Sequence, residues 1–124
     1  MRDVLKFKTM QEMCNEADEY VTTIKDEDVK ACAKLLMISC YSYMSEFMQD
    51  DSKRTYQNVS TLIKYEMLAT GRQDVTSKFK EILANAPDRA TSKRVYELYY
   101  TCPIELKKRA QLQLMSKLLP QHIK

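Results

Sequence analysis

The stretch Asp26–Met48, DEDVKACAKLLMISCYSYMSEFM, decides the fold of this chain. It opens with three acidic residues, and carboxylates favour the start of a helix, where backbone N–H groups lack partners. Apolar residues then recur at the three-and-four spacing of one helix face: Val29, Cys32, Ala33, Leu36, Cys40, Tyr43, Met44 and Phe47. The face is widened further by Leu35, Met37, Ile38 and Tyr41. A helix that is apolar over most of its circumference is normally surrounded by others, so the stretch predicts a central helix.

The composition favours an all-α fold. The 124 residues include one glycine and three prolines, which leaves little material for β-turns, while helix formers are abundant. A chain of this length forms one domain with a sizeable core. Its eight tyrosines suit helix packing with the hydroxyl groups kept near water. We expect a compact bundle of about six helices around the central one, with residues 1–8 as a lead-in linker, 9–119 as the helical core and 120–124 as a tail.

Capping signals place the helices on either side of the central one. Thr9 and Glu12 have the spacing of a capping box, which predicts a first helix with an apolar face from Met10 to Ile24. Residues 49–54 contain no apolar side chain and read as a loop. Asn58 is the expected N-cap of a third helix, which would bury Val59, Leu62, Ile63 and Met67, and Gly71 supplies the left-handed residue at its end.

Three shorter patterns complete the expected bundle. Asp74 is the expected N-cap of a fourth helix, with its inner face formed by Val75, Phe79, Ile82 and Leu83. A fifth helix is expected from Asp88 to Tyr100, burying Ala90, Val95, Leu98 and Tyr99. Pro103 suits the first position of a sixth helix, which Pro120 would stop and whose buried residues would be Ile104, Ala110, Leu114, Leu118 and Leu119.

Cysteine and histidine usage argues against metal and thiol chemistry. The four cysteines show no C-x-x-C spacing, and His122, expected in the tail, is the only histidine, so neither a zinc site nor a Cys–His pair is expected. Cys14, Cys32 and Cys40 occupy apolar helical positions and are interpreted as reduced core thiols, which fits a reducing compartment. The sequence shows neither a membrane-spanning run nor a signal peptide, so we expect a cytoplasmic domain without membrane contact.

The inventory for catalysis is poor. One glycine cannot make a phosphate-binding loop. The carboxylate pairs Glu16/Glu19 and Asp50/Asp51 fall on polar faces and loops, and Ser39 and Cys40 have no base nearby in the sequence. We therefore expect no enzyme activity and no cofactor.

Charge is distributed unevenly along the chain. Residues 1–50 carry six Lys or Arg and ten Asp or Glu, whereas residues 51–124 carry fourteen and seven. A basic flank of this kind can meet nucleic acid or an acidic partner, and Tyr96 or Tyr100 could stack on bases. The alternative is a set of solvated charges, and three consecutive basic residues cannot all face one groove. The candidate DNA- or partner-binding residues are Arg89, Lys93, Arg94, Lys107, Lys108, Arg109 and Lys117.

Several short segments follow one another in a characteristic order. QNVSTL at 57–62 leads to a helix ending in MLA at 67–69, then FKEI at 79–82, Pro87-Asp88, a helix with paired tyrosines and a basic helix closing at Leu118-Leu119. Together with the acidic lead-in and central helix, this order resembles the all-alpha domain of type IV secretion coupling proteins, the TraG/TrwB-type conjugation ATPases, in their Gram-positive branch. The similarity covers roughly residues 20 to 120 and rests on pattern and order.

The resemblance implies a recognition module. In that family the all-alpha domain is a helical insertion in the motor of a membrane-anchored ATPase, at the cytoplasmic face, and it is thought to receive relaxase or relaxosome accessory proteins and DNA, single- or double-stranded. Its partners would also include the remainder of the coupling ATPase, which carries the nucleotide-binding motifs. One departure is Cys102-Pro103-Ile104-Glu105, where Gram-positive relatives often have small residues and a Gly-Lys-Thr-like start.

Two alternatives belong to other classes. One is a free-standing helical DNA-binding or regulatory protein of a mobile element, which a gene without Walker motifs would indicate. The other is a helical adaptor with no nucleic-acid role, for which protein binding insensitive to salt would be the sign.

Overall fold

The computed structural model describes residues 5–122, and the side chains of residues 5–118. This part contains no β-strand. The all-α prediction is confirmed by six α-helices and one short 3-10 helix: α1 (Met10–Tyr20), α2 (Glu27–Phe47), η1 (Asp51–Lys53), α3 (Tyr56–Ala69), α4 (Lys78–Ala84), α5 (Thr91–Tyr100) and α6 (Ile104–His122).

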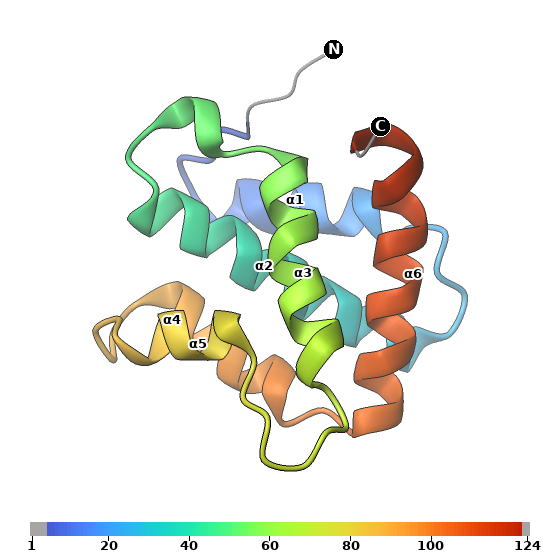
Figure 1. Cartoon of the computed structure of the whole chain (residues 1–124). Helices are drawn as coiled ribbons and strands as arrows, with labels where there is room; N and C mark the ends of the chain where they lie inside the picture. Colours follow the sequence, from blue (N-terminus) through green and yellow to red (C-terminus); the bar gives the residue numbers. More distant parts are fainter. Residues whose placement is uncertain (1–4, 123–124) are drawn as a thin grey trace.

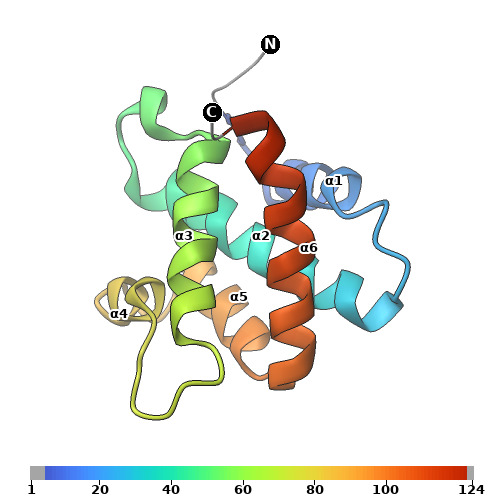
Figure 2. The ribbon, with the colours of Figure 1, turned by 45° about the vertical axis from the view of Figure 1, so that its right-hand side comes forward.

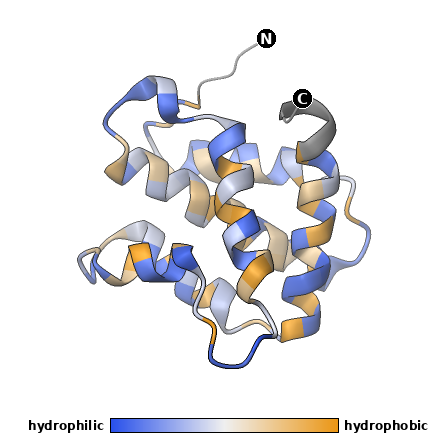
Figure 3. Cartoon of the chain, in the orientation of Figure 1, coloured by the Kyte–Doolittle hydropathy of each residue, from blue (hydrophilic) through white to orange (hydrophobic). Residues whose placement is uncertain are grey.

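The helices form a compact bundle around α2 (Figure 1). α1, α3, α5 and α6 all pack against α2, while α4 lies against α3 and α5. α3 and α6 run antiparallel, side by side, across the same side of α2 (Figure 2). Hydrophilic and hydrophobic residues alternate along these helices, as an amphipathic packing requires (Figure 3).

The central helix forms as its sequence predicts. The Asp26 side chain accepts hydrogen bonds from the backbone N–H groups of Asp28 and Val29, at 2.9 and 3.2 Å. The buried face includes two serines, Ser39 and Ser42, whose hydroxyl groups donate to backbone carbonyls one turn earlier and so leave no unpaired polar group. Phe47, expected on the buried face, is 41 % exposed.

The first helix also begins where expected. The Thr9 hydroxyl accepts from the Glu12 N–H at 3.1 Å, and the Glu12 carboxylate accepts from the Thr9 N–H at 3.0 Å, which confirms the capping box. The described part of the lead-in, residues 5–8, is attached to the rest of the chain, because the Leu5 N–H donates to the Arg54 carbonyl and the Leu5 side chain is buried. Residues 1–4 of the expected linker lie outside the described residues.

The predicted N-caps of α3 and α4 are wrong. Thr55, not Asn58, caps α3, since its hydroxyl accepts from the Asn58 N–H, while the Asn58 side chain donates to the Lys53 carbonyl. Ser77, not Asp74, caps α4; Asp74 lies in the preceding loop with a φ of 64°. In both cases several capping residues lie close together in the sequence, and the backbone conformation selects among them.

The predicted faces of α5 and α6 are partly wrong. Ala90 and Tyr99 are buried as predicted, but Leu98 is 59 % exposed because α5 turns Ser92 and Tyr96 inward. Ile104 of α6 is 49 % exposed. Two residues outside these helices were also expected to be buried and are exposed: Met67 of α3, and Val75, which precedes α4.

Neither proline of the sixth helix acts as predicted. α6 begins at Ile104, one residue after Pro103, whose carbonyl accepts from the Lys107 N–H. The helix continues two residues past Pro120 to His122, so the proline does not stop it and the expected tail at 120–124 is partly helical. The side chains of Leu119 and His122 lie outside the described residues.

Gly71 confirms the expected end of α3, with a φ of 81° two residues after the last helical position. A Cβ atom there would lie 2.9 Å from Lys108 Cε, so the glycine also lets α6 approach the loop between α3 and α4.

Tyrosines and cysteines fill much of the core. Tyr41 and Tyr99 are fully buried, against the expectation that tyrosine hydroxyls stay near water; Tyr41 instead shares a hydrogen bond with Tyr56 at 3.0 Å. The four cysteines, all within the described residues, are free thiols. Cys32 and Cys40 are buried, as predicted, while Cys14 is only half-buried. No helix among residues 5–122 is long and apolar enough to cross a bilayer.

Candidate functional site

The basic residues before and within α5 do not form one patch, and some of them contact the turn that precedes the helix. Lys93 Nζ lies 3.0 Å from the Asp88 carboxylate and 3.1 Å from the Ala86 carbonyl, so this lysine closes the turn before α5. The Arg94 side chain is exposed and its Nε lies 3.4 Å from the Asp88 carbonyl. Arg89 is exposed in the same turn.

The basic residues of α6 point in different directions. Lys107 is buried, Lys108 is exposed and lies against Gly71, and Arg109 is exposed and forms an ion pair with Asp26 at 3.3 Å. Lys117, two turns further on, is half-buried; its ammonium group donates to the Tyr20 carbonyl and to the Thr23 hydroxyl.

The seven candidates therefore do not converge on one site. Arg89 precedes α5, and Lys93 and Arg94 lie in its first turn. Lys107 instead contacts Tyr100, the last residue of α5. Ten helical residues span about 15 Å. Lys93, Lys107 and Lys117 are engaged inside the fold, and the exposed members on the two last helices and the turn before them are Arg89, Arg94, Lys108 and Arg109.

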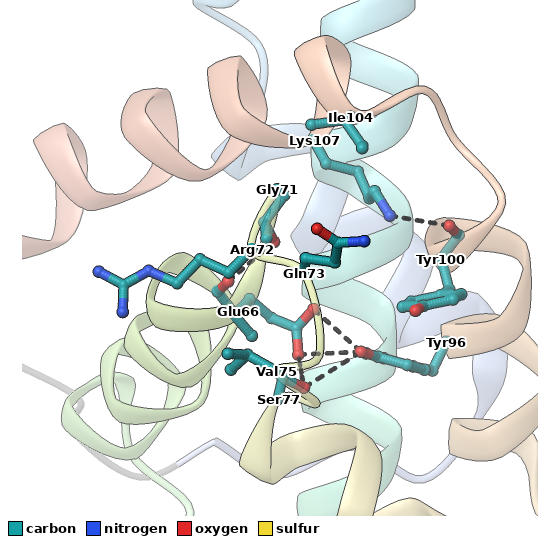
Figure 4. A pocket seen from close by; sticks show the side chains of 12 residues that line it. Glu66, Gly71, Arg72, Gln73, Val75, Ser77, Tyr96, Tyr100, Ile104 and Lys107 are labelled. Atoms are coloured by element: carbon teal, nitrogen blue, oxygen red, sulfur yellow. Dashed lines mark hydrogen bonds between the residues drawn. The ribbon is translucent and has the colours of Figure 1, made fainter.

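The feature that the helices do build together is a cavity of about 280 Å³. It lies between the end of α3, the loop at 70–77, the end of α5 and the start of α6. The side chains that line it combine charged, hydroxyl and apolar groups (Figure 4): Glu66, Arg72, Ser77, Tyr96, Tyr100, Ile104 and Lys107 among others.

Glu66 stands at the inner wall of this cavity and is 2 % exposed. Its carboxyl group accepts hydrogen bonds from Ser77 Oγ and from the Tyr96 hydroxyl, the latter at 3.0 and 2.9 Å. Burial raises the pKa of Glu66, because desolvation disfavours the carboxylate more than the hydroxyl donors and Lys107 favour it. The same burial raises the pKa of Tyr96 and of Tyr99 well above the usual tyrosine value.

Lys107 stands at the opposite wall and is 7 % exposed. Its Nζ donates to the Tyr100 carbonyl at 2.9 Å and lies 4.3 Å from the centroid of the Tyr100 ring. Figure 4 shows the Lys107 and Glu66 side chains on either side of the Gln73 amide, with the Arg72 guanidinium turned away from both.

Tyr100 separates this cavity from a second one of about 220 Å³. The ring is half-exposed, stacks on Tyr96 with 6.0 Å between centroids, and carries Lys80 Nζ 3.8 Å from its centroid. The second cavity is mainly apolar on its inner side, with Leu83 and Ala84 beside Tyr96.

The sequence singled out Lys107 and Tyr100 for surface contacts but missed Glu66. A signal was present, because Glu66 follows Val59, Leu62 and Ile63 at helical spacing and therefore lies on the buried face of α3. Ser77 and Gln111 carried no comparable signal. Gln111 Nε2 donates to the Tyr99 hydroxyl at 2.7 Å and to Thr70 Oγ1 at 2.8 Å, which ties α6 to α5 and to the end of α3.

Within residues 5–122, His, Cys, Asp and Glu side chains form no group of three or more that could hold a metal ion. In comparisons with known proteins, no family model, no curated protein and no solved structure matches this chain.

Proposed function

We propose that this chain is a substrate-recognition domain of a conjugative type IV secretion coupling ATPase, with no catalytic motif of its own. It would receive relaxase or relaxosome accessory proteins, together with DNA, and would act beside the remainder of the ATPase. The proposal takes its identity from the order of sequence segments described above, and its support in the structure is the distribution of exposed basic groups.

The observation that carries the proposal is the late basic surface, defined as Arg89, Arg94, Lys108 and Arg109. All four side chains are exposed and belong to α5, α6 or the turn before α5. Arg89 precedes α5 and Arg94 lies in its first turn, whereas Lys108 and Arg109 lie beyond its end. Most of the length of α5 therefore separates the two pairs. Basic groups spread over such a distance suit a large polyanion or an acidic protein face.

The structure also indicates which residues a test should change. Lys93, Lys107 and Lys117 hold turns and helices together, so reversing their charge would perturb the fold. Arg109 balances Asp26 at the start of α2. Arg89, Arg94 and Lys108 are the members of the late basic surface that form no ion pair with a described residue.

The test is the triple charge reversal Arg89→Glu, Arg94→Glu and Lys108→Glu. The wild-type chain and the variant are titrated with single-stranded DNA, duplex DNA and a purified relaxase complex at two salt concentrations. We expect affinity for DNA to fall by about tenfold or more in the variant, and the wild-type affinity to fall steeply with salt because bound phosphates release counterions.

A matched control carries the same change in charge elsewhere. Lys8, Lys53 and Lys64 are exposed and lie outside α5, α6 and the turn between α4 and α5. Reversal of these three changes the net charge by the same amount as the test variant, so it controls for long-range electrostatics. Its DNA affinity should differ from that of the wild-type chain by no more than about twofold. Equal losses in both triple variants, or binding of neither DNA nor the relaxase complex by the wild-type chain, would overturn the proposal.

A further inference from the structure

The cavity between α3, α5 and α6 has the features of a ligand site, and the proposed docking role does not use it. We propose that it binds an aliphatic monocarboxylate, with Lys107 as the cation that receives the carboxylate and Glu66 as the group that makes binding depend on pH. The carboxylate could belong to a small molecule or to the acidic side chain of a peptide, and the experiment below distinguishes the two sources.

Lys107 is a buried cation with spare hydrogen-bonding capacity. An ammonium group has three N–H donors, and among residues 5–118 Lys107 Nζ makes one hydrogen bond, to the Tyr100 carbonyl. None of the ion pairs among the described residues includes Lys107. Burying a charge costs free energy unless the charge is paired, so an anion that enters the cavity would supply the missing partner.

The rest of the lining selects the kind of anion. The cavity holds one buried cation and, opposite it, one buried carboxyl group, so a doubly charged phosphate would meet repulsion from Glu66 whenever Glu66 is ionised. Val75, Tyr100 and Ile104 supply half-exposed apolar surface at the mouth, which fits a short aliphatic stem. A volume of about 280 Å³ accommodates such a group.

The protonation state of Glu66 affects how tightly the cavity binds an anion. The titratable groups that face it are Tyr96 and Tyr99 from α5, Lys107 from α6 and Cys40 from α2. Lys107 favours the carboxylate form of Glu66, and an anion bound to Lys107 would cancel that effect. Binding therefore raises the pKa of Glu66 further, and by reciprocity the anion binds most tightly when Glu66 is protonated.

The experiment is a titration of the full chain with butyrate, followed by NMR at about pH 5 and about pH 8. Butyramide, which has the same shape without the charge, is the matched probe, and inorganic phosphate tests the charge class. An acetylated and amidated Ala-Glu-Ala peptide represents the peptide source. We expect saturable shifts at Lys107, Tyr100 and Ile104 with butyrate or the peptide, weaker at the higher pH, and none with butyramide.

Two variants assign the roles. Lys107→Met keeps an apolar stem and should weaken carboxylate binding by about tenfold or more, whereas Lys80→Met, which removes the other lysine on the Tyr100 ring, should not. Glu66→Gln should lose the tighter binding at the lower pH and keep only the pH dependence that comes from titration of the ligand, which is common to both proteins. If Lys107→Met fails to fold, the pH dependence of ligand binding by Glu66→Gln tests the proposal instead.

The outcomes separate cleanly. Binding of butyrate and peptide alike supports a site for free carboxylates, and binding of the peptide alone supports an acidic protein segment as the source. The proposal is overturned if neither binds, if phosphate binds more tightly than butyrate, or if Lys107→Met retains full affinity while folded. None of these results depends on whether the chain binds DNA or relaxase, so the proposed function can fail independently.

Discussion

The carboxyl group of Glu66 is enclosed by hydroxyl groups of Ser77 and Tyr96, with water largely excluded. Hydroxyl donors stabilise the carboxylate, yet desolvation has the larger effect and the pKa is raised. The residue thus contributes more to stability when it is neutral than when it is charged.

This arrangement predicts how stability changes with pH. The folded pKa of Glu66 lies above its ordinary value of 4.5, so the stabilisation by the neutral form is complete below about 4.5 and is lost as pH rises through the folded pKa. Glu66→Gln removes this titration. The free energy of unfolding of wild type, measured with urea, should therefore fall relative to that of Glu66→Gln as pH rises.

The exposed Glu81 provides the control for this comparison. Glu81→Gln should change stability by less than about 0.5 kcal/mol, as surface substitutions usually do. A difference between wild type and Glu66→Gln that stays constant across pH would contradict the argument from burial.

At the scale of elements, α5 depends on α2 for its N-terminal cap. Ala90, at the N-cap position, provides no side-chain hydrogen bond. The Glu46 carboxylate from the last turn of α2 accepts instead from the N–H groups of Thr91 and Ser92, both at 2.9 Å. The negative charge also suits the positive end of the α5 dipole, so the contact fixes where α5 begins against α2.

Removing this cap should destabilise the protein measurably. Glu46→Ala is expected to lower the free energy of unfolding by about 1 kcal/mol, within the usual range for loss of an N-cap. Adding Ala90→Ser, which supplies a local acceptor, should recover part of that loss. Glu97→Ala, an exposed position on α5 without a capping role, is the control, and an equal loss there in urea unfolding would refute the assignment.

The elements show what a sequence can and cannot predict. α2 was predictable, because its acidic start and wide apolar face are properties of one continuous stretch. The start of α5 was not, because its cap comes from a residue more than forty positions earlier in the chain. The start of α4 failed for a related reason: Ser77 also bonds Glu66 on α3, a tertiary contact that Asp74 does not make.

The candidate site was predictable only in part, and the reason lies at the scale of the whole molecule. The sequence predicted that the basic residues lie on or beside two late helices. It did not predict the distance that α5 places between them. Lys107 was expected at the surface, whereas packing of α6 on α3 and α5 buries it beside Tyr100. Glu66 lay on a predicted apolar face, yet only the fold shows that the same cavity brings it opposite a lysine.

The central position of α2 has a kinetic consequence. Because α1, α3, α5 and α6 each bury surface against it, most tertiary contacts cannot form until α2 exists. We expect α2 to be helical in the folding transition state. Ala31→Gly, at an exposed position in α2, lowers helix propensity by about 1 kcal/mol and should slow refolding about fivefold while leaving unfolding nearly unchanged.

The exposed Gln113 in α6 allows the opposite comparison. Gln113→Gly, compared with Gln113→Ala, removes a similar helix propensity from α6. We expect α6 to dock after the transition state, so this change should mainly accelerate unfolding. Stopped-flow measurements of both pairs decide the order. If the two helices behave alike, α2 is the centre of the finished structure without being the place where folding starts.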